Sequence, residues 1–427
     1  MIKTAFLILG FMVCLASCKP QPSSPAALAE LQQLLSQKSY FKLRDLLAQQ
    51  QNQLEEHHRL YYEAFVLKAF GQNEGSNQHI SILLSKHAAQ FNDSLTLGLL
   101  DLQAANHLFL YQYQQAAALY TQILADYPQL LEEADRANYL NNQQLFGSFA
   151  NVPPQKMHKS GEVRVSAYRN AFNHLMCPVT VQGQTNDFIF DTGANLSTIS
   201  ESTAQKMKLR LFDQAIELGS STQISVQATL AVADSLYLGE LLFENVVFLV
   251  LPDAQLSFPE IDYHIEGIIG FPVMHQMGEV HLHSNGELSI PAQPSATTRS
   301  NMFFEGLNPV VEVRTGSDTL LFTFDTGAKS SELSYRYYQN HEAEVQQKGE
   351  LQSNQSGGVG GLTTVEEYML RNFPLQLGSK QASLAQIPVK LEEYGFNKYF
   401  DGNLGQDLFT QFNTLILNFE GMYVDFE

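Results

Sequence analysis

The sequence repeats one phrase, which reads Phe188-Ile189-Phe190-Asp191-Thr192-Gly193-Ala194 in its first copy and Leu321-Phe322-Thr323-Phe324-Asp325-Thr326-Gly327-Ala328 in its second. In each copy an apolar run with the composition of a β-strand stops at Asp-Thr-Gly-Ala, and the two aspartates lie 134 positions apart. An ionisable carboxylate at the end of a buried strand is unfavourable unless it is hydrogen-bonded or takes part in chemistry. One four-residue match can arise by chance, but two copies with further matched features indicate an internal repeat.

Each copy is followed by a second shared feature, an apolar segment that ends in glycine. The segments are Glu266-Gly267-Ile268-Ile269-Gly270 and Asp401-Gly402-Asn403-Leu404-Gly405, and their first glycines lie 76 and 77 positions after the aspartates. Alternating apolar residues around turn residues predict a hairpin before each aspartate and another after each glycine segment. These hairpins are expected over 178–190, 278–290, 309–324 and 413–424. The sequence therefore predicts two mainly β lobes, 162–295 and 302–427, joined by a connector at 296–301.

The doubled motif resembles the aspartic peptidases, especially the retropepsin-like group, and the two lobes within one chain resemble pepsin. This resemblance implies a bilobal fold in which Asp191 and Asp325, one from each lobe, form a pair around a pseudo-twofold axis. It implies that Thr192 and Thr326 interlock beneath the pair. It also implies that Gly193 and Gly327 let the backbone pass close to the carboxylates. The glycine segments would buttress the aspartate loops, although Asn403 stands where the family usually carries an apolar residue.

The chemistry of such a pair follows from its electrostatics. Two carboxylates about 3 Å apart cannot both ionise readily, so they share one proton. The ionised member can take a proton from water while the protonated member polarises the scissile carbonyl, and neither a metal nor a cofactor is required. Ala194 and Ala328 stand where pepsin-like enzymes often carry a hydroxyl that can donate to the carboxylate. Without that donor we expect the pair to keep its proton to higher pH, with activity in mildly acidic to neutral solution.

A glycine-rich segment in the second lobe, Gly357-Gly358-Val359-Gly360-Gly361, resembles the flap that closes over a peptide in retropepsins. It lacks the Lys-Ser/Thr of a phosphate-binding loop, which argues against phosphate binding. A lid that covers bound substrate is one interpretation, and a plain flexible loop is the other. The matching part of the first lobe, 218–222, contains less glycine, so closure is expected to be asymmetric.

The N-terminus has the pattern of a targeting segment. Lys3 precedes an apolar stretch, Ala5–Val13, which leads to Leu15-Ala16-Ser17-Cys18. This pattern resembles the lipobox of bacterial lipoproteins. The resemblance implies a signal peptide over 1–18, a lipid on Cys18 and a place in the bacterial cell envelope, facing the periplasm or the cell surface. An ordinary secretory peptide with a chance cysteine is the alternative.

Composition narrows the classes of partner. The chain of 427 residues is too long for one core, and 44% hydrophobic residues are ordinary for globular protein. A net charge of −19 argues against nucleic acid and against electrostatic docking on anionic lipid. No stretch approaches the about 18 apolar residues of a membrane span, so membrane contact is expected through the lipid alone.

With Cys14 in the signal and Cys18 lipidated, Cys177 remains alone and is predicted to be a core residue rather than a nucleophile.

The region 26–149 differs in composition, since it is rich in Leu, Ala, Gln and Tyr and poor in glycine. Its apolar residues recur at helical spacing, as at Leu43 and Leu47, which predicts amphipathic helices. The segment 111–128 resembles the second helix of a tetratricopeptide repeat. This region could offer a docking surface to a protein partner or serve as a spacer above the membrane. Short linkers are expected on its two sides, at 19–25 and 150–161.

Other candidate sites carry less chemistry. His281 and His283 lie on one face of a strand, which suggests a metal pair or, without a third ligand, ordinary solvated histidines. His57 and His58 are expected to point in two directions from a helix surface. Neither Gly-x-Ser-x-Gly nor His-Glu-x-x-His occurs, so serine-hydrolase and zincin mechanisms have no support.

The sequence is best interpreted as a lipid-anchored, monomeric aspartic endopeptidase that acts on peptides or proteins. A catalytically silent protein of the same fold, which binds peptides, is the alternative from another class. A homodimer that shares half-sites is a further alternative, but two complete motifs in one chain make it unnecessary.

Overall fold

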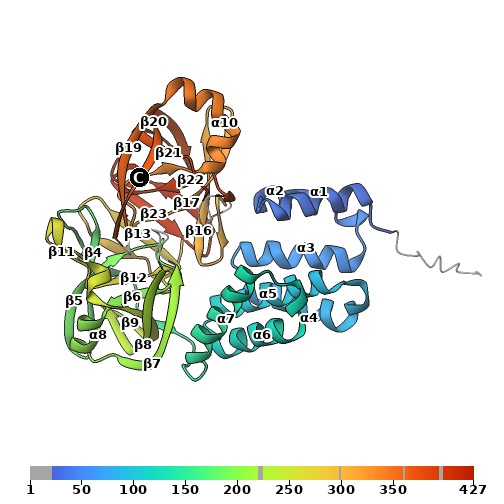
Figure 1. Ribbon diagram of the computed structural model, residues 1–427, viewed down its shortest axis with the longest axis horizontal. Coiled ribbons are helices and arrows are strands. Elements are labelled where there is room, and N and C mark those ends of the chain that lie inside the picture. Colours follow the sequence, from blue (N-terminus) through green and yellow to red (C-terminus); the bar gives the residue numbers. More distant parts are fainter. Residues whose placement is uncertain (1–21, 220–224, 298–299, 359–360, 394–397) are drawn as a thin grey trace, which may run out of the picture.

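The computed structural model describes residues 22–219, 225–297, 300–358, 361–393 and 398–427. Its first part is helical and the rest is mainly β, which confirms the predicted order. Figure 1 shows the helices on one side and, beside them, two β lobes one above the other. The predicted signal peptide, with Cys18, lies outside the described residues. Among the residues that are described, no helix is both long enough and apolar enough to cross a bilayer.

The helical part is a series of helices in which consecutive members pack against each other. Local sequence sets its start, because the Ser24 hydroxyl accepts the Ala27 amide and Pro25 occupies the first helical position of α1. Leu43 and Leu47 are buried, as their spacing predicts. The helices are α1 (Pro25–Ser36), α2 (Tyr40–Gln50), α3 (Glu56–Ala69), α4 (Asn73–Lys86), α5 (Asp93–Phe109), α6 (Tyr113–Asp126) and α7 (Glu133–Ser148), with short 3-10 turns η1 (Gln51–Gln53), η2 (Ala88–Gln90) and η3 (Pro128–Leu130).

The main sheet of the first lobe has the order β1-β9-β6-β12-β5-β4-β8-β7 in its described residues, with β3 beside β4, and β10 and β11 form a separate two-stranded sheet. The hairpin predicted before Asp191 is confirmed as β4 and β5. The predicted linker is partly wrong, because Lys156–His158 forms β1 and pairs with β9. The elements are β1, β3 (Tyr168–Arg169), β4 (Leu175–Val181), β5 (Gln184–Phe190), β6 (Ser197–Ser200), α8 (Glu201–Lys206), β7 (Arg210–Gly219), β8 (Ser225–Leu238), β9 (Leu241–Leu251), η4 (Asp253–Leu256), β10 (Ser257–Phe258), η5 (Pro259–Ile261), β11 (Tyr263–His264), β12 (Gly267–Ile269) and α9 (Phe271–His275).

The second lobe repeats this plan, with the strand order β15-β16-β17-β22-β18-β21-β20-β19 in its described part. The hairpin predicted before Asp325 is confirmed as β16 and β17. Its elements are β15 (Met302–Glu305), β16 (Asn308–Thr315), β17 (Asp318–Phe324), β18 (Glu332–Leu333), α10 (Tyr335–Lys348), β19 (Glu350–Gly358), β20 (Gly361–Leu377), β21 (Lys380–Lys390), β22 (Gly402–Leu404) and α11 (Gln406–Phe409).

A third sheet joins the lobes, because β13 (Glu279–His283) of the first pairs antiparallel with β23 (Thr414–Asn418) of the second. Its remaining strands are β2 (Val163–Val165), β14 (Leu288–Ile290) and β24 (Tyr423–Phe426). The fully buried Glu279 accepts hydrogen bonds from Asn418 Nδ2 of the second lobe (2.6 Å) and from the amide of Ser295, the residue before the connector (2.6 Å). These bonds satisfy a buried carboxylate and tie both lobes to the chain between them.

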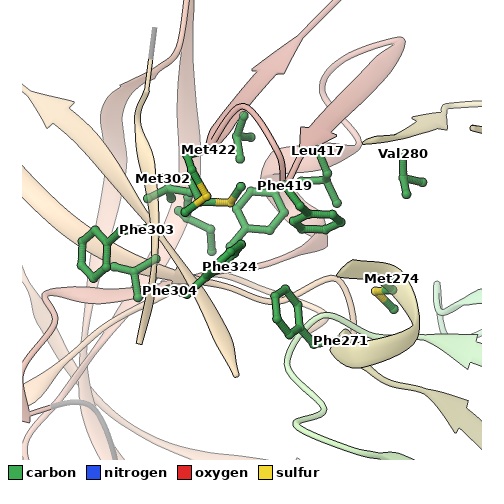
Figure 2. Packing of buried hydrophobic residues seen from close by; sticks show 14 of the residues in the cluster. Phe271, Met274, Val280, Met302, Phe303, Phe304, Phe324, Leu417, Phe419 and Met422 are labelled. Carbon is green, nitrogen blue, oxygen red and sulfur yellow. The ribbon is translucent and has the colours of Figure 1, made fainter. Parts of the chain in front are cut away.

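Aromatic side chains fill the junction of the lobes and the helices. Figure 2 shows Phe271 of the first lobe with Phe304 and Phe419 of the second, and the ring centroids of Phe271 lie 5.3 Å from Phe304 and 5.6 Å from Phe419. Phe109, at the end of α5, extends this cluster, since its ring lies 5.4 Å from Phe304. The helices therefore share a hydrophobic core with both lobes.

A buried charged cluster also holds the helices to the second lobe. Glu305, at the end of β15, is ion-paired with Lys38 and accepts a hydrogen bond from the Tyr40 hydroxyl (3.2 Å). The buried Lys68 donates to the Phe304 carbonyl (3.2 Å). Burial opposes ionisation of Glu305, but the charges of Lys68 and Lys38 hold its pKa below the ordinary value. The ionised carboxylate is thus compensated by two cations of the helical part.

Candidate active site

Each predicted aspartate follows the last residue of a central strand. In the first lobe β5 pairs parallel with β12, and the Asp191 amide donates to the Ile269 carbonyl (3.0 Å). In the second lobe β17 pairs parallel with β22, and the Asp325 amide donates to the Leu404 carbonyl (3.0 Å). The glycine segments therefore support the two aspartate loops, as expected from the sequence.

The two loops are joined across the lobes by their threonines, both of which are fully buried. Thr192 Oγ1 donates to the Phe324 carbonyl (2.7 Å) and accepts the Thr326 amide (3.0 Å). Thr326 Oγ1 likewise donates to the Phe190 carbonyl (2.9 Å) and accepts the Thr192 amide (3.0 Å). Four hydrogen bonds thus fix the ends of β5 and β17 relative to each other.

The glycine of each motif lies against the carboxylate of the other lobe. A Cβ atom added at Gly193 would stand 2.7 and 2.8 Å from the carboxylate oxygens of Asp325, and one at Gly327 would stand 2.5 and 2.6 Å from those of Asp191. Real Cβ atoms do not approach oxygen so closely, so both positions require glycine. This reciprocal contact places the two carboxyl groups together at the meeting of the lobes.

The environment of the pair favours one shared proton. The Gly193 amide donates to Asp191 Oδ1 (2.8 Å), and the Gly327 amide donates to Asp325 Oδ1 (2.8 Å). Burial and the charge of Asp325 raise the pKa of Asp191 well above its usual range. A carboxyl group that remains protonated beside an ionised one can serve as an acid while its partner serves as a base.

Two serines that the sequence analysis missed complete the supports. Ser197 Oγ accepts the Gly270 amide (3.1 Å) in the first lobe, and Ser331 Oγ accepts the Gly405 amide (3.0 Å) in the second. Both serines are buried. The signal was present in the sequence, because each serine lies six positions after its aspartate, in Asp-Thr-Gly-Ala-Asn-Leu-Ser and Asp-Thr-Gly-Ala-Lys-Ser-Ser.

The glycine-rich segment lies at the tip of a long hairpin. Gly357 and Gly358 end β19, Gly361 begins β20, and Gly358 pairs with Gly361 in the register of the two strands. Val359 and Gly360 lie outside the described residues, so the predicted flap is described only up to its tip. The first lobe has a corresponding hairpin, β7 and β8, whose tip at 220–224 also lies outside the described residues.

The histidine pair of β13 is partly exposed and hydrogen-bonded within the sheet. His281 Nε2 contacts the carboxylate of Glu279 (2.6 Å), while His283 contacts Thr414 Oγ1 through Nδ1 (3.2 Å) and Ser289 Oγ through Nε2 (2.8 Å). Both rings are half-buried in the sheet that joins the lobes. Their hydrogen bonds serve the packing of that sheet, and both nitrogens of His283 are occupied.

His57 and His58 do not point apart, which corrects the expectation from their spacing. Their ring centroids lie 4.0 Å apart with 37° between the planes, close to the carboxylate of Glu55. His58 Nδ1 also contacts Ser23 Oγ (2.8 Å). The cluster lies at the start of α3.

Cys177 is fully buried, as predicted, and burial raises its pKa above the ordinary value for a thiol. A thiol in such surroundings is a poor nucleophile.

Comparison with known proteins agrees with this geometry in the first lobe. Residues 177–273 match the family model for aspartyl proteases. The matched span includes Asp191 and runs from β4 to α9. A search of curated proteins finds no match to the chain. The second lobe lies outside the matched span, and its likeness to the first lobe rests on the repeated strands, motif and hydrogen bonds described above.

Proposed function

We propose that the chain is a bilobal aspartic endopeptidase in which Asp191 and Asp325 form one catalytic pair. The observation that carries this proposal is the reciprocal contact of the two motifs, in which each glycine touches the opposite carboxylate. A protein that merely bound peptides would gain nothing from holding two like charges together at the end of buried strands. The match of residues 177–273 to aspartyl proteases supports the same conclusion.

In the proposed reaction a water molecule lies between the carboxyl groups. The ionised aspartate accepts a proton from this water as the oxygen attacks the scissile carbonyl, and the protonated aspartate donates to the carbonyl oxygen. The resulting tetrahedral diol breaks down when the leaving nitrogen receives a proton from the pair. No covalent enzyme intermediate forms. The threonine interlock keeps both carboxyl groups in place throughout, which is the positioning that such catalysis needs.

Peptide cleavage tests the proposal. The mature protein, Asp191→Asn and Asp325→Asn are incubated with a mixed peptide library between pH 4 and 7, and new termini are identified by mass spectrometry. We expect cleavage by the wild-type protein and a decrease of at least about 100-fold in each variant. Equal cleavage by all three proteins would end the peptidase hypothesis.

A silent peptide-binding protein remains the rival function, and the same samples distinguish it. Binding of uncleaved peptides is measured by calorimetry for the wild-type protein and the two asparagine variants. Peptide binding by the wild-type protein without cleavage at any pH from 4 to 7 would favour the rival.

We further propose that the protein is a bacterial lipoprotein attached to a membrane through Cys18. The composition of the first 18 residues supports this assignment. In a bacterial host, Cys18→Ser should release the protein from membranes and abolish the added mass of the lipid. Membrane association of Cys18→Ser equal to that of wild type would contradict it.

The helical part has the antiparallel helix pairs and the closing proline that resemble tetratricopeptide repeats, and we propose that its outer face can dock a protein partner. Its inner face is already occupied by the lobes. A role as a removable inhibitory segment fits poorly, because Phe109 is part of the core shared with both lobes.

A further inference from the structure

The two aspartate loops differ in the side chains that lie beneath them. In the first lobe Ile268 of β12 pairs in register with Ile189 of β5, and both are buried and apolar. At the equivalent place in the second lobe, Asn403 of β22 pairs with Thr323 of β17. A polar pair therefore replaces an apolar pair next to only one of the two carboxylates.

This polar pair points toward the second aspartate. Thr323 Oγ1 donates to Asn403 Oδ1 (2.8 Å), and Asn403 Nδ2 donates to Asp325 Oδ2 (3.5 Å). The threonine contact orients the amide so that its N–H groups, and not its oxygen, face the carboxylate. The second distance is at the long limit for a hydrogen bond, and such contacts often tighten when substrate binds.

The backbone around the aspartates has the same asymmetry. Asp325 Oδ1 accepts two amides, from Gly327 (2.8 Å) and from Ala328 (2.9 Å). In the first lobe the Ala194 amide instead donates to the backbone carbonyl of Asp191 (3.4 Å). Donors stabilise the ionised form of a carboxyl group. The Gly193 and Gly327 amides also act to lower the pKa of Asp191, so the side-chain amide of Asn403 is the donor that distinguishes the surroundings of Asp325 and favours charge there.

We propose that Asn403, oriented by Thr323, is a positioning residue that keeps the negative charge of the pair on Asp325 and the shared proton on Asp191. This inference rests on the proposed function. It assigns Asp325 as the base and Asp191 as the acid. Asn403 supplies from a neighbouring strand the side-chain donor that Ala328 lacks.

The assignment gives a balanced reaction. As the water oxygen bonds to the carbonyl carbon, one water proton moves to Asp325 and the Asp191 proton moves to the carbonyl oxygen. The tetrahedral diol then loses a hydroxyl proton back to Asp191 as the carbonyl reforms. Asp325 gives its proton to the leaving nitrogen as the C–N bond breaks, which restores the starting state without another reactant.

Other charged groups near the pair bear on its titration. His174 lies in the field of Asp325, but burial lowers the pKa of this histidine. Glu332 of β18 is the register partner of Asn403 and is ion-paired with Lys390 (3.4 Å), which also pairs with Glu367. From α11, Gln406 donates to the Thr326 carbonyl and accepts from Arg169 (2.6 Å). In the tests below, His174→Gln provides a background without the charge of this histidine.

The pH dependence of kcat/KM tests the proposal through Asn403→Leu, which keeps the shape of asparagine without its donor. The asparagine contact stabilises the singly ionised pair relative to the fully protonated pair, so its loss should move the acid limb to higher pH. We expect a threefold to tenfold loss of kcat/KM on the acid limb. The alkaline limb should not move, because Asn403 contacts an ionised Asp325 in both the singly and the doubly ionised pair. Thr323→Val should move the acid limb in the same direction by less, and the shift should persist with His174→Gln.

The matched control is Ile268→Leu, an apolar exchange at the equivalent position of the first lobe, which should leave the acid limb in place. An unmoved limb in Asn403→Leu, or an equal shift in Ile268→Leu, would overturn the proposal. Carbon-13 NMR of the aspartate carboxyl groups gives a readout without activity. Asp325 should ionise first in the wild-type protein and later in Asn403→Leu, whereas first ionisation of Asp191 would contradict the assignment. If no peptide is cleaved, this titration still decides the inference separately from the proposed function.

Discussion

Thr192 and Thr326 each accept the other's backbone amide and donate to the carbonyl that ends the other lobe's strand. The two threonines and the residues that carry the two carbonyls, Phe190 and Phe324, are all buried. Thr192→Val should therefore leave the Thr326 amide and the Phe324 carbonyl without these partners. The expected loss is about 1–3 kcal/mol of unfolding free energy for each buried group left unpaired. Urea denaturation of Thr192→Val, beside Thr192→Ser as the control that keeps the hydroxyl, measures this loss. A valine variant as stable as the serine variant would show that the threonine hydrogen bonds contribute nothing to the free energy of unfolding.

Much of this interlock could be predicted from the sequence, because the motif recurs with the same neighbours in both lobes. The strands before Asp191 and Asp325 and the supporting glycine segments follow from local pattern alone. The partner of β13 does not, because alternation specifies which face of a strand is buried and not which strand lies beside it. For the same reason the pairing of Lys156–His158 with β9 was missed. The contact of Asn403 with Asp325 depends on the angle between strands, which no local pattern contains.

The packing of the helices against the lobes likewise could not be read from local pattern, and it leads to a stability prediction. Phe109 is buried. The centroid of its ring lies 6.1 Å from that of Phe271, 5.4 Å from that of Phe304 and 5.5 Å from that of His275. Phe109→Ala should cost about 3–5 kcal/mol because it opens a cavity where three parts of the chain meet. Calorimetry should show one cooperative transition that moves to lower temperature. Loss of the helical transition alone, with the lobes unfolding as in wild type, would mean that the helices are an independent domain.

Acid should weaken the attachment of the helices through Glu305. Its pKa is held below the ordinary value by Lys68 and Lys38, so its ionised form contributes stability above the unfolded pKa, near 4.5. That contribution is lost as pH falls toward the lower pKa of the folded state. Glu305→Gln should lower the free energy of unfolding by about 3–5 kcal/mol at pH 7, because two buried cations lose their counter-charge. At pH 3 the difference in unfolding free energy between the variant and the wild-type protein should be smaller. Urea unfolding at both pH values tests this, and a pH-independent difference would argue against ionic compensation.

Ionisation of Asp191 should lower the stability of the protein as pH rises, the opposite of the effect expected for Glu305. Burial and the neighbouring Asp325 raise its pKa above that of the unfolded chain. Between these two pKa values the folded state binds more protons than the unfolded state, so stability falls as pH rises. Asp191→Asn should therefore be more stable than wild type at pH 7, by about 1.4 kcal/mol for each pH unit of that difference. At pH 3 the advantage should nearly vanish. Thermal unfolding at pH 3, 5 and 7 measures it, and a variant less stable than wild type at pH 7 would show that the pair is not under electrostatic strain.

The pH dependence of activity should change when a hydroxyl is placed beside Asp191, the aspartate without a side-chain amide donor. Wild-type activity is expected in mildly acidic to neutral solution, because Ala194 offers no side-chain donor and the Ala194 amide is engaged by a backbone carbonyl. Ala194→Ser adds a donor on the Asp191 side, which should stabilise charge there and compete with the donors around Asp325. The alkaline limb, which reports loss of the last proton of the pair, should then move to lower pH. Profiles of kcat/KM for Ala194→Ser and for Ala328→Ser, the matched change in the other lobe, test this point. Because Asp325 is already ionised on that limb, the Ala328 variant should move the acid limb instead, and identical shifts in both variants would contradict the asymmetry of the pair.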